Sequence, residues 1–541
     1  MGVGKTLLRP IASAAGWYAS RQVRAFLSAL RRTRQVQDRL LGRLLAASAD
    51  SAFGRDHGLE RVRTYDDFVS AVPVGDYETH RPYVDRLLAG DDRALFGPGT
   101  RVLMFAVTSG TTGAPKHIPV TARFLREYRR GWNIFGVRAL RDHPAGWLRG
   151  IVTIASSARE SYSAGGIPCG AISGLLSERQ MWIVRQMYPV PPAAANIPDA
   201  ASKYYTVIRS SIAHDIALVA TANPSALIKL AQTARDHAER LIRDVRDGTL
   251  RAPGEMPGPL LSALRFRPDR RAARRLEAVL DRHGELVPKH FWNLAFISHW
   301  TGGTVGLYLP QVRRLYGDDL PIRDIGLLAS EGRLSIPLAD GTPAGAAEIT
   351  SNFLEFIPAE QIEADAPDVL RAHEVEPGRE YFIVLSNWAG LWRYHINDRV
   401  RVTERIGEAP VIEFLSKGQH TCSITGEKLT EHQVVAAMAR AAGAAGAAVD
   451  TFVLQGHFAA TPYYALRLAD GNGCDTAALA EAMDRALCDL NVEYDAKRRS
   501  GRLGPIRAAA ADARLAAAAR QTQAEQYKHT YLLTDVVNDD D

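Results

Sequence analysis

The chain has 541 residues, of which 46% are hydrophobic and 23% are charged, with a formal net charge of +6 at pH 7. This length exceeds one ordinary hydrophobic core, so we expect at least two domains in a globular chain. The sequence has no run of eighteen or more apolar residues, and we therefore expect no transmembrane helix. Its four cysteines suggest no disulfide framework, which fits a reducing, cytoplasmic location.

The N-terminal part predicts a helical region at about residues 18–45, and the apolar run 102–107 predicts a buried strand. A loop rich in glycine and hydroxyl residues, 108–115, follows that strand and is closed by Lys116. Glycines let the backbone approach an anion closely, hydroxyls add donors, and a lysine adds a point charge. The loop is therefore typical of a site that holds the phosphates of a nucleotide.

The loop differs from the phosphate-binding loop of kinases and GTPases, because no glycine directly precedes Lys116. The segment Gly4-Lys5-Thr6 is a closer textual match to the end of that motif, but no strand precedes it. We therefore exclude the kinase-type interpretation for both segments.

The middle of the chain alternates short apolar strands with helical patterns. Strands are predicted at 151–154, 216–219 and 381–385, and helices at 225–242 and 271–283. Such alternation predicts α/β layers. The basic stretch 265–271 continues into the amphipathic helix 271–283, so we assign its charge to a solvated helix face and expect no nucleic-acid partner.

A smaller unit is predicted after the strand 411–415. Thr430 and Gln433 form a capping-box pattern that predicts the start of a helix, expected over 434–442. Further elements are expected in chain order: strands 451–454 and 463–468, a helix at 476–490, and an alanine-rich helix at 508–519. The four cysteines form no C-x-x-C pair, and the histidines show no metal-ligand spacing, so we expect no structural zinc site.

These motifs together resemble a known family. The loop 108–116 is similar to the signature of the acyl-adenylate-forming superfamily, and its continuation His117-Ile118-Pro119 resembles the Gretchen Hagen family of acyl acid amido synthetases. Further segments resemble that family: 53–58, 72–74, 76–78, 300–304 and 329–332. The resemblance runs from about residue 50 to the C-terminus. It implies an α/β fold with a large N-terminal ATP- and acyl-binding domain, 1–416, and a smaller α+β mobile domain, 417–541.

The resemblance also implies roles for individual residues. Lys116 and Lys528 would be catalytic, the first at the phosphates and the second at the reacting centre. Glu331 would hold Mg²⁺, because a hard cation prefers carboxylate oxygen, and Asp398 would accept hydrogen bonds from the ribose hydroxyls. The implied nucleotide-binding residues are Ser109, Gly110, Thr111, Thr112, Gly113, Gly302, Gly303, Thr304, Ser330, Glu331, Asp398 and Lys417.

Two positions depart from the family pattern. Leu327 stands where plant members have an aromatic residue, so ring stacking on adenine would be lost. Asn397 stands where the family has glycine before the aspartate, and asparagine tolerates positive φ better than most residues.

The resemblance implies that ATP and Mg²⁺ serve to activate a small carboxylic acid as acyl-AMP, which then reacts with an amine or amino acid, and we expect a monomer. Two alternatives stay open from the sequence alone. One is an acid–thiol ligase that makes an acyl-CoA, and the other is a nucleotide- or acyl-binding protein without turnover. The sequence identifies neither the acid nor the amine.

Overall fold

The computed structural model describes residues 20–108, 115–302, 308–418, 421–422, 424–425, 427, 429–449, 451–459, 461–469, 474–499, 503–512, 515 and 529–539. Two compact units divide the backbone. The first comprises 1–222, 230–299 and 320–414, and the second comprises 223–229, 300–319 and 415–541. No helix among the described residues combines the length and the hydropathy needed to cross a bilayer.

The first unit begins with helices. Residues 20–30 are helical, and a turn at 31–32 separates them from the next helix, so the single helical region expected at 18–45 is divided. Arg32 has φ −139°, which is outside the helical range and interrupts the helix. The helices that follow are α2 (Thr33–Ser48), α3 (Ala52–Asp56), α4 (Tyr65–Ala71) and α5 (Tyr77–Leu88).

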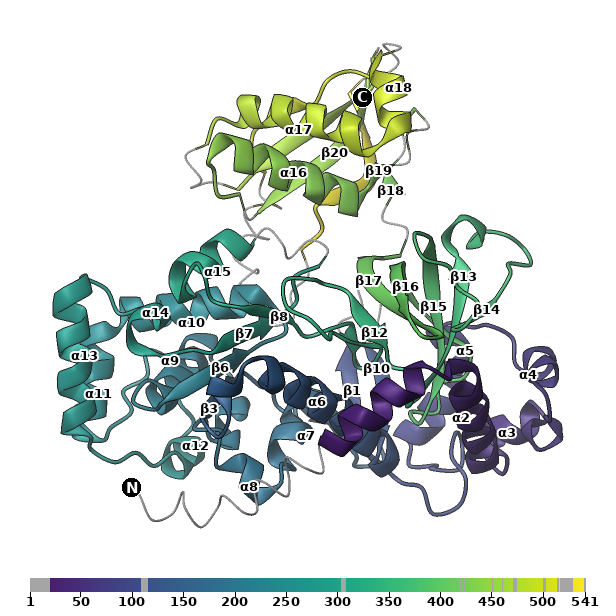
Figure 1. The fold of residues 1–541 in the computed structure, drawn as a ribbon, viewed down its shortest axis with the longest axis horizontal. Helices are drawn as coiled ribbons and strands as arrows, with labels where there is room; N and C mark the ends of the chain where they lie inside the picture. The colour runs from purple at the N-terminus through teal and green to yellow at the C-terminus, as the bar shows by residue number, and fades with distance from the viewer. Residues whose placement is uncertain are drawn as a thin grey trace. The chain divides into compact units, whose positions relative to one another are not determined.

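Three sheets form the body of the first unit (Figure 1). A four-stranded sheet has the order β2-β1-β5-β4 and contains β1 (Val102–Thr108), β2 (Lys116–Thr121), β4 (Ser161–Tyr162) and β5 (Pro168–Gly170). A parallel sheet has the order β3-β6-β7-β8 and contains β3 (Gly150–Thr153), β6 (Ile216–Ala220), β7 (Phe296–His299) and β8 (Ile322–Asp324).

The third sheet is seven-stranded, with the order β11-β12-β17-β16-β15-β13-β14. Its strands are β11 (Ser335–Ile336), β12 (Gly345–Ala347), β13 (Asn352–Pro358), β14 (Leu370–Arg371), β15 (Glu380–Asn387), β16 (Tyr394–Ile406) and β17 (Ala409–Lys417). Between the parallel and seven-stranded sheets in the chain, β9 (Leu328–Ala329) and β10 (Gly332–Arg333) make a short hairpin. Strands β13 and β15 are almost wholly buried, so this sheet is part of the core.

Helices connect the parallel strands, as the α/β interpretation expects: α7 (Ile172–Glu178), α8 (Trp182–Arg185), α9 (Ala200–Ser211), α10 (Pro224–Asp236), α11 (Ala238–Asp247), α12 (Gly258–Ala263), α13 (Arg270–His283), α14 (Pro288–Phe291) and α15 (Leu309–Tyr316). Helix α6 (Ala122–Asp142) precedes them and lies between β2 and β3 in the chain. The expected helix 225–242 is two helices, because His237, at φ −118° and ψ 24°, leaves the helical conformation between them.

The second unit contains an α+β fold with the sheet order β22-β21-β20-β23. The strands of this sheet are β20 (Phe452–Phe458), β21 (Tyr463–Leu468), β22 (Arg507–Ala509) and β23 (Leu532–Asn538). A separate two-stranded sheet contains β18 (Thr421–Cys422) and β19 (Leu429–Thr430). The helices of the unit include α16 (Glu431–Ala445), α17 (Thr476–Leu490) and α18 (Val492–Arg499). The expected strand 463–468 and helix 476–490 are confirmed.

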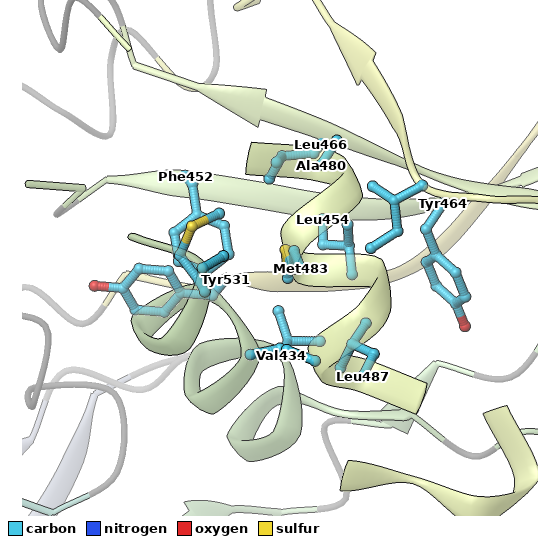
Figure 2. Close-up of a cluster of buried hydrophobic side chains, with 14 of the residues drawn as sticks. Val434, Phe452, Leu454, Tyr464, Leu466, Ala480, Met483, Leu487 and Tyr531 are labelled. Atoms are coloured by element: carbon cyan, nitrogen blue, oxygen red, sulfur yellow. The ribbon is translucent and has the colours of Figure 1, made fainter. Parts of the chain in front are cut away.

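The core of this unit lies between α16, α17 and the sheet (Figure 2). Val434 on α16 and Met483 on α17 are both fully buried, and they meet Phe452 and Leu454 from β20. Each large apolar side chain buried in this way stabilises the fold by about 1.5–3 kcal/mol. The capping box predicted at Thr430 is present, since its hydroxyl accepts from the Gln433 N–H.

The predicted helix 508–519 is wrong at its start. Arg507–Ala509 form β22, which pairs in parallel with Ala465–Arg467 of β21. Alanine is the best helix former in isolation, but pairing with an existing sheet edge outweighs that preference here. Residues 513–514 and 516–519 lie outside the described part of the chain.

Candidate active site

Lys116 is the first residue of β2, directly opposite Thr108 at the end of β1. The two strands therefore hold both ends of the loop 109–114, which itself lies outside the described residues. The Lys116 ammonium donates to the Tyr394 hydroxyl over 3.4 Å. It also lies 5.5 Å from the ring centre of Tyr77 and 5.9 Å from that of Tyr394. Within the described parts of the chain, no carboxylate forms an ion pair with this ammonium.

Tyr77 is held at the start of α5, where the Asp76 carboxylate caps the helix by accepting from Glu78 and Thr79 N–H groups. The hydroxyl of Tyr77 accepts from the His117 N–H over 2.8 Å. This bond joins α5 to β2 at the residue after Lys116. It fixes the backbone from which the lysine side chain extends.

Asp398 lies inside β16. Residues 396–398 of β16 stand opposite the single residue Ile383 of β15, because His395 pairs with Val384 and Arg399 with Phe382. The bulge contains a left-handed residue, Asn397, with φ 64°. Asp398 is buried, with 4% of its surface exposed. The glycine-to-asparagine departure is therefore accommodated.

Ser330 and Glu331 are the two turn residues of the β9–β10 hairpin, since Ala329 pairs with Gly332. The Asn387 side chain donates to the Glu331 carbonyl over 2.7 Å and also donates to Asn352 over 3.0 Å. These bonds anchor the turn on β15 and β13. The hairpin follows β8 in the chain, at the carboxyl end of the parallel sheet, where ligands bind in open α/β folds.

Leu327, at the position of the missing aromatic residue, is partly exposed. Its backbone carbonyl accepts from the Leu334 N–H over 2.8 Å, and its N–H donates to the Ser335 hydroxyl over 2.9 Å. The aliphatic side chain is thus presented from a fixed backbone. An aliphatic side chain at this position provides no ring for stacking on a flat ligand.

Burial and nearby negative charges both change the pKa of Tyr394. Burial raises the pKa of Tyr394 well above its ordinary value, and the negative charges of Glu331, Asp76 and Asp398 raise it further. The phenol therefore stays protonated at neutral pH. Tyr128 on α6, whose hydroxyl donates to the Ala329 carbonyl over 3.4 Å, has its pKa raised by burial too.

One region of the first unit therefore brings together an ammonium at the base of a phosphate-type loop and two acidic residues, Glu331 and Asp398. An ammonium suits phosphate, a buried carboxylate suits a pair of ribose hydroxyls, and another suits a cation that bridges phosphates. Mg²⁺ is commonly held by one or two carboxylates together with substrate phosphates. The lone carboxylate of Glu331 fits that donor set, although the described residues contain no group of three metal-ligating side chains.

The remaining candidate residues belong to the second unit or lie outside the described residues. Gly302 and Lys417 belong to the second unit, the former in a bend after β7 and the latter at the end of β17. Other candidates lie outside the described residues: Ser109, Gly110, Thr111, Thr112, Gly113, Gly303, Thr304 and Lys528. Their roles stay predictions.

Sequence reasoning missed the two tyrosines. Both lie in segments that resemble the family, Tyr77 beside Asp76 and Tyr394 four residues before Asp398, but no role followed from the motif. A possible signal was the presence of an aromatic residue close to each conspicuous acid. The pattern could not show that residues separated by about 300 positions meet at one lysine.

Two family models match the chain. One, described as the GH3 family N-terminal domain, matches residues 22–322, and the other, the GH3 family central domain, matches residues 346–417. The first alone covers more than half of the 541 residues.

The curated relatives align with most of the chain, at low sequence identity. The chain is 24% identical over 507 residues to a probable indole-3-acetic acid-amido synthetase, GH3.2, of Oryza sativa subsp. japonica, covering 87% of this chain and 81% of the relative. It is also 24% identical over 433 residues to the jasmonoyl–L-amino acid synthetase JAR6 of Nicotiana attenuata, covering 75% and 73%.

Among solved structures, the fold matches AtGH3.15, an acyl acid amido synthetase in complex with 2,4-DB. The TM-score is 0.80 at 19% identity, and the match covers 96% of this chain and 95% of that chain. At that identity the match establishes the fold.

Proposed function

The chain belongs to the GH3 family, and from that premise we propose that it is an ATP-dependent acyl acid amido synthetase. The observation that carries the proposal is the grouping of Lys116, Glu331 and Asp398 in one region of the first unit. Curated relatives named as amido synthetases support it.

In the first half-reaction, a carboxylate oxygen of the acid attacks the α-phosphorus of ATP. The P–O bond to the β-phosphate breaks, and pyrophosphate leaves as acyl-AMP forms. Lys116 and the loop Ser109 to Gly113 would bind the phosphates, Asp398 the ribose, and Lys528 the reacting centre. Glu331 would hold Mg²⁺, whose charge would neutralise the phosphates when bound.

In the second half-reaction, the lone pair of an amine attacks the acyl carbonyl carbon. The C–O bond to the phosphate breaks, AMP leaves, and the nitrogen loses a proton to give the amide. An amino acid is the proposed amine, and the smaller domain, 417–541, would turn about Lys417 between the two half-reactions. No covalent intermediate with the enzyme is needed.

The proposal is tested by ATP–pyrophosphate exchange over a panel of aromatic, fatty and oxo acids. Exchange that depends on one class of acid is the expected result, and Glu331→Gln should reduce it most at low Mg²⁺ concentration. Measurable ATP binding without exchange for any acid would favour a binding protein without turnover instead.

A further inference from the structure

The Lys116 ammonium lies between aromatic residues from two distant parts of the chain, Tyr77 on α5 and Tyr394 on β16. A lysine side chain has four rotatable carbon–carbon bonds, and holding it in one direction normally requires an ion pair. Here the described residues supply no carboxylate partner. They supply the Tyr394 hydroxyl at 3.4 Å and the Tyr77 ring, whose centre is 5.5 Å away, and both attract a cation without neutralising it.

Tyr394 is itself held rigidly. Its side chain is fully buried, and its ring packs edge-to-face with the His80 ring, with 5.5 Å between the two ring centres. His80 is fixed at both nitrogens, with Nε2 accepting from the Trp392 N–H at 3.0 Å and Nδ1 donating to the Asp76 carbonyl at 2.9 Å. Burial lowers the pKa of His80, so the imidazole stays neutral and keeps this arrangement at neutral pH.

The backbone before Tyr394 is equally constrained. Arg393 has φ 40°, a left-handed conformation that costs a non-glycine residue about 1 kcal/mol or more. Its guanidinium forms a buried ion pair with Glu355 at 3.0 Å and donates to the Val72 carbonyl at 3.0 Å. Gly75 bonds the backbone on both sides of Tyr394, at Arg393 and His395. These contacts compensate for the strain and fix the direction of the tyrosine.

We propose that Tyr394, assisted by Tyr77, is a positioning residue that aims the Lys116 ammonium at the phosphates of ATP while leaving its charge available. This inference rests on the proposed function only in naming ATP as the ligand. Since Tyr394 is fully buried, it acts through Lys116 and does not need to touch the nucleotide.

A double-mutant cycle with Tyr394→Phe and Lys116→Met tests the coupling. In the wild-type background, Tyr394→Phe should lower kcat/KM for ATP in pyrophosphate exchange by about tenfold, the effect of one lost hydrogen bond to a charged group. In the Lys116→Met background, the same change should have less than a twofold effect. An equal loss in both backgrounds would overturn the proposal, because a merely structural role does not depend on Lys116.

A second cycle, with Tyr77→Phe and Lys116→Met, keeps the test valid if Tyr394→Phe does not fold. Tyr77→Phe keeps the ring but removes the acceptor for the His117 N–H, and the same cycle should show the same dependence on Lys116. Thermal unfolding of each variant identifies any that fail to fold. If Tyr77→Phe lowers kcat/KM for ATP by the same factor with and without Lys116, while Tyr394→Phe does not, Tyr77 is removed from the proposal.

The dissociation constant of ATP separates this inference from the proposed function. If the wild type binds ATP but exchanges with no acid, the proposed function fails, and the cycle is then measured on ATP affinity, with the same dependence on Lys116 expected. A wild type that does not bind ATP would overturn both.

Discussion

Lys116 in the first unit and Glu427 in the second are both charged residues, yet their surroundings are opposite. The buried Glu427 carboxylate accepts from the Ile424 and Thr425 N–H groups at 2.8 Å each and from the Tyr464 hydroxyl. The ammonium of Lys116 donates to one hydroxyl, that of Tyr394, and lies 5.5 Å from the ring centre of Tyr77. A charge with a full set of hydrogen bonds stabilises the fold, whereas a charge that lacks a counter-ion is available to a ligand.

The largest expected effect is that of Lys528→Ala, which extends the comparison to the second proposed catalytic lysine. Loss of one preorganised electrostatic contact at the reacting centre should slow adenylation by about 10²–10³. Acid-dependent pyrophosphate exchange measures this rate. An exchange rate equal to that of the wild type would remove Lys528 from the mechanism.

Lys116→Met should also slow exchange by about 10²–10³, because the phosphates lose their point charge. The thermal midpoint should stay close to that of the wild type, since no described ion pair depends on this lysine. Lys289→Met, at an exposed position on α14, is the matched control and should leave both quantities unchanged. A large loss of stability in Lys116→Met would instead make this lysine structural, like Glu427.

Glu427→Ala should show the reverse behaviour. It leaves the Ile424 and Thr425 N–H groups and the Tyr464 hydroxyl without their acceptor, which costs about 3 kcal/mol of unfolding free energy. Chemical denaturation measures the loss. At 15 °C, where the variant is expected to be folded, Glu427→Ala should bind ATP with wild-type affinity. A loss of ATP affinity in the folded variant would contradict the structural assignment of Glu427.

Asp398→Ala should weaken ATP binding by about tenfold or more, through lost hydrogen bonds to a charged acceptor. Asn397→Gly is the matched neighbour, since glycine adopts the same positive φ, and it should retain ATP affinity. Calorimetric titration with ATP compares the two variants. Wild-type affinity in Asp398→Ala would refute the ribose role.

The smallest effect concerns pH. Burial alone would raise the pKa of Glu427, but hydrogen bonds from Ile424, Tyr464 and Thr425 outweigh it and hold the pKa below its ordinary value of 4.5. A lowered carboxyl pKa contributes stability that is present above pH 4.5 and is lost as the pH falls through the lower folded value. Unfolding free energy measured between pH 7 and 3 should therefore fall less steeply in Glu427→Gln. Identical slopes would contradict this assignment.

Local signals in the sequence predicted much of the fold. The capping box at Thr430, the strand 463–468 and the helix 476–490 depend on neighbouring residues and were confirmed. The strand at Arg507–Ala509 was missed because it forms only by pairing with β21. Helix interruptions at Arg32 and His237 carry no proline or glycine and were equally invisible.

In the candidate site, too, some residues could be predicted from local motifs, whereas others depend on tertiary packing. Glu331 and Asp398 could be named because each lies in a short motif with a resemblance to a family. Tyr77 and Tyr394 could not, because their meeting at Lys116 depends on how α5, β2 and β16 pack. The bulge around Asn397 depends on the register of β15 with β16, which no single stretch of sequence encodes.

The most direct test of the central claim is amide formation without coenzyme A. The purified chain is given ATP, Mg²⁺, a pool of acids that support pyrophosphate exchange and a pool of amino acids, and the products are identified by mass. The account predicts an acyl–amino acid amide and AMP in equal amounts, with both formed about 10²–10³ more slowly in Lys116→Met. Product that appears only when coenzyme A is added, as a thioester, would contradict it.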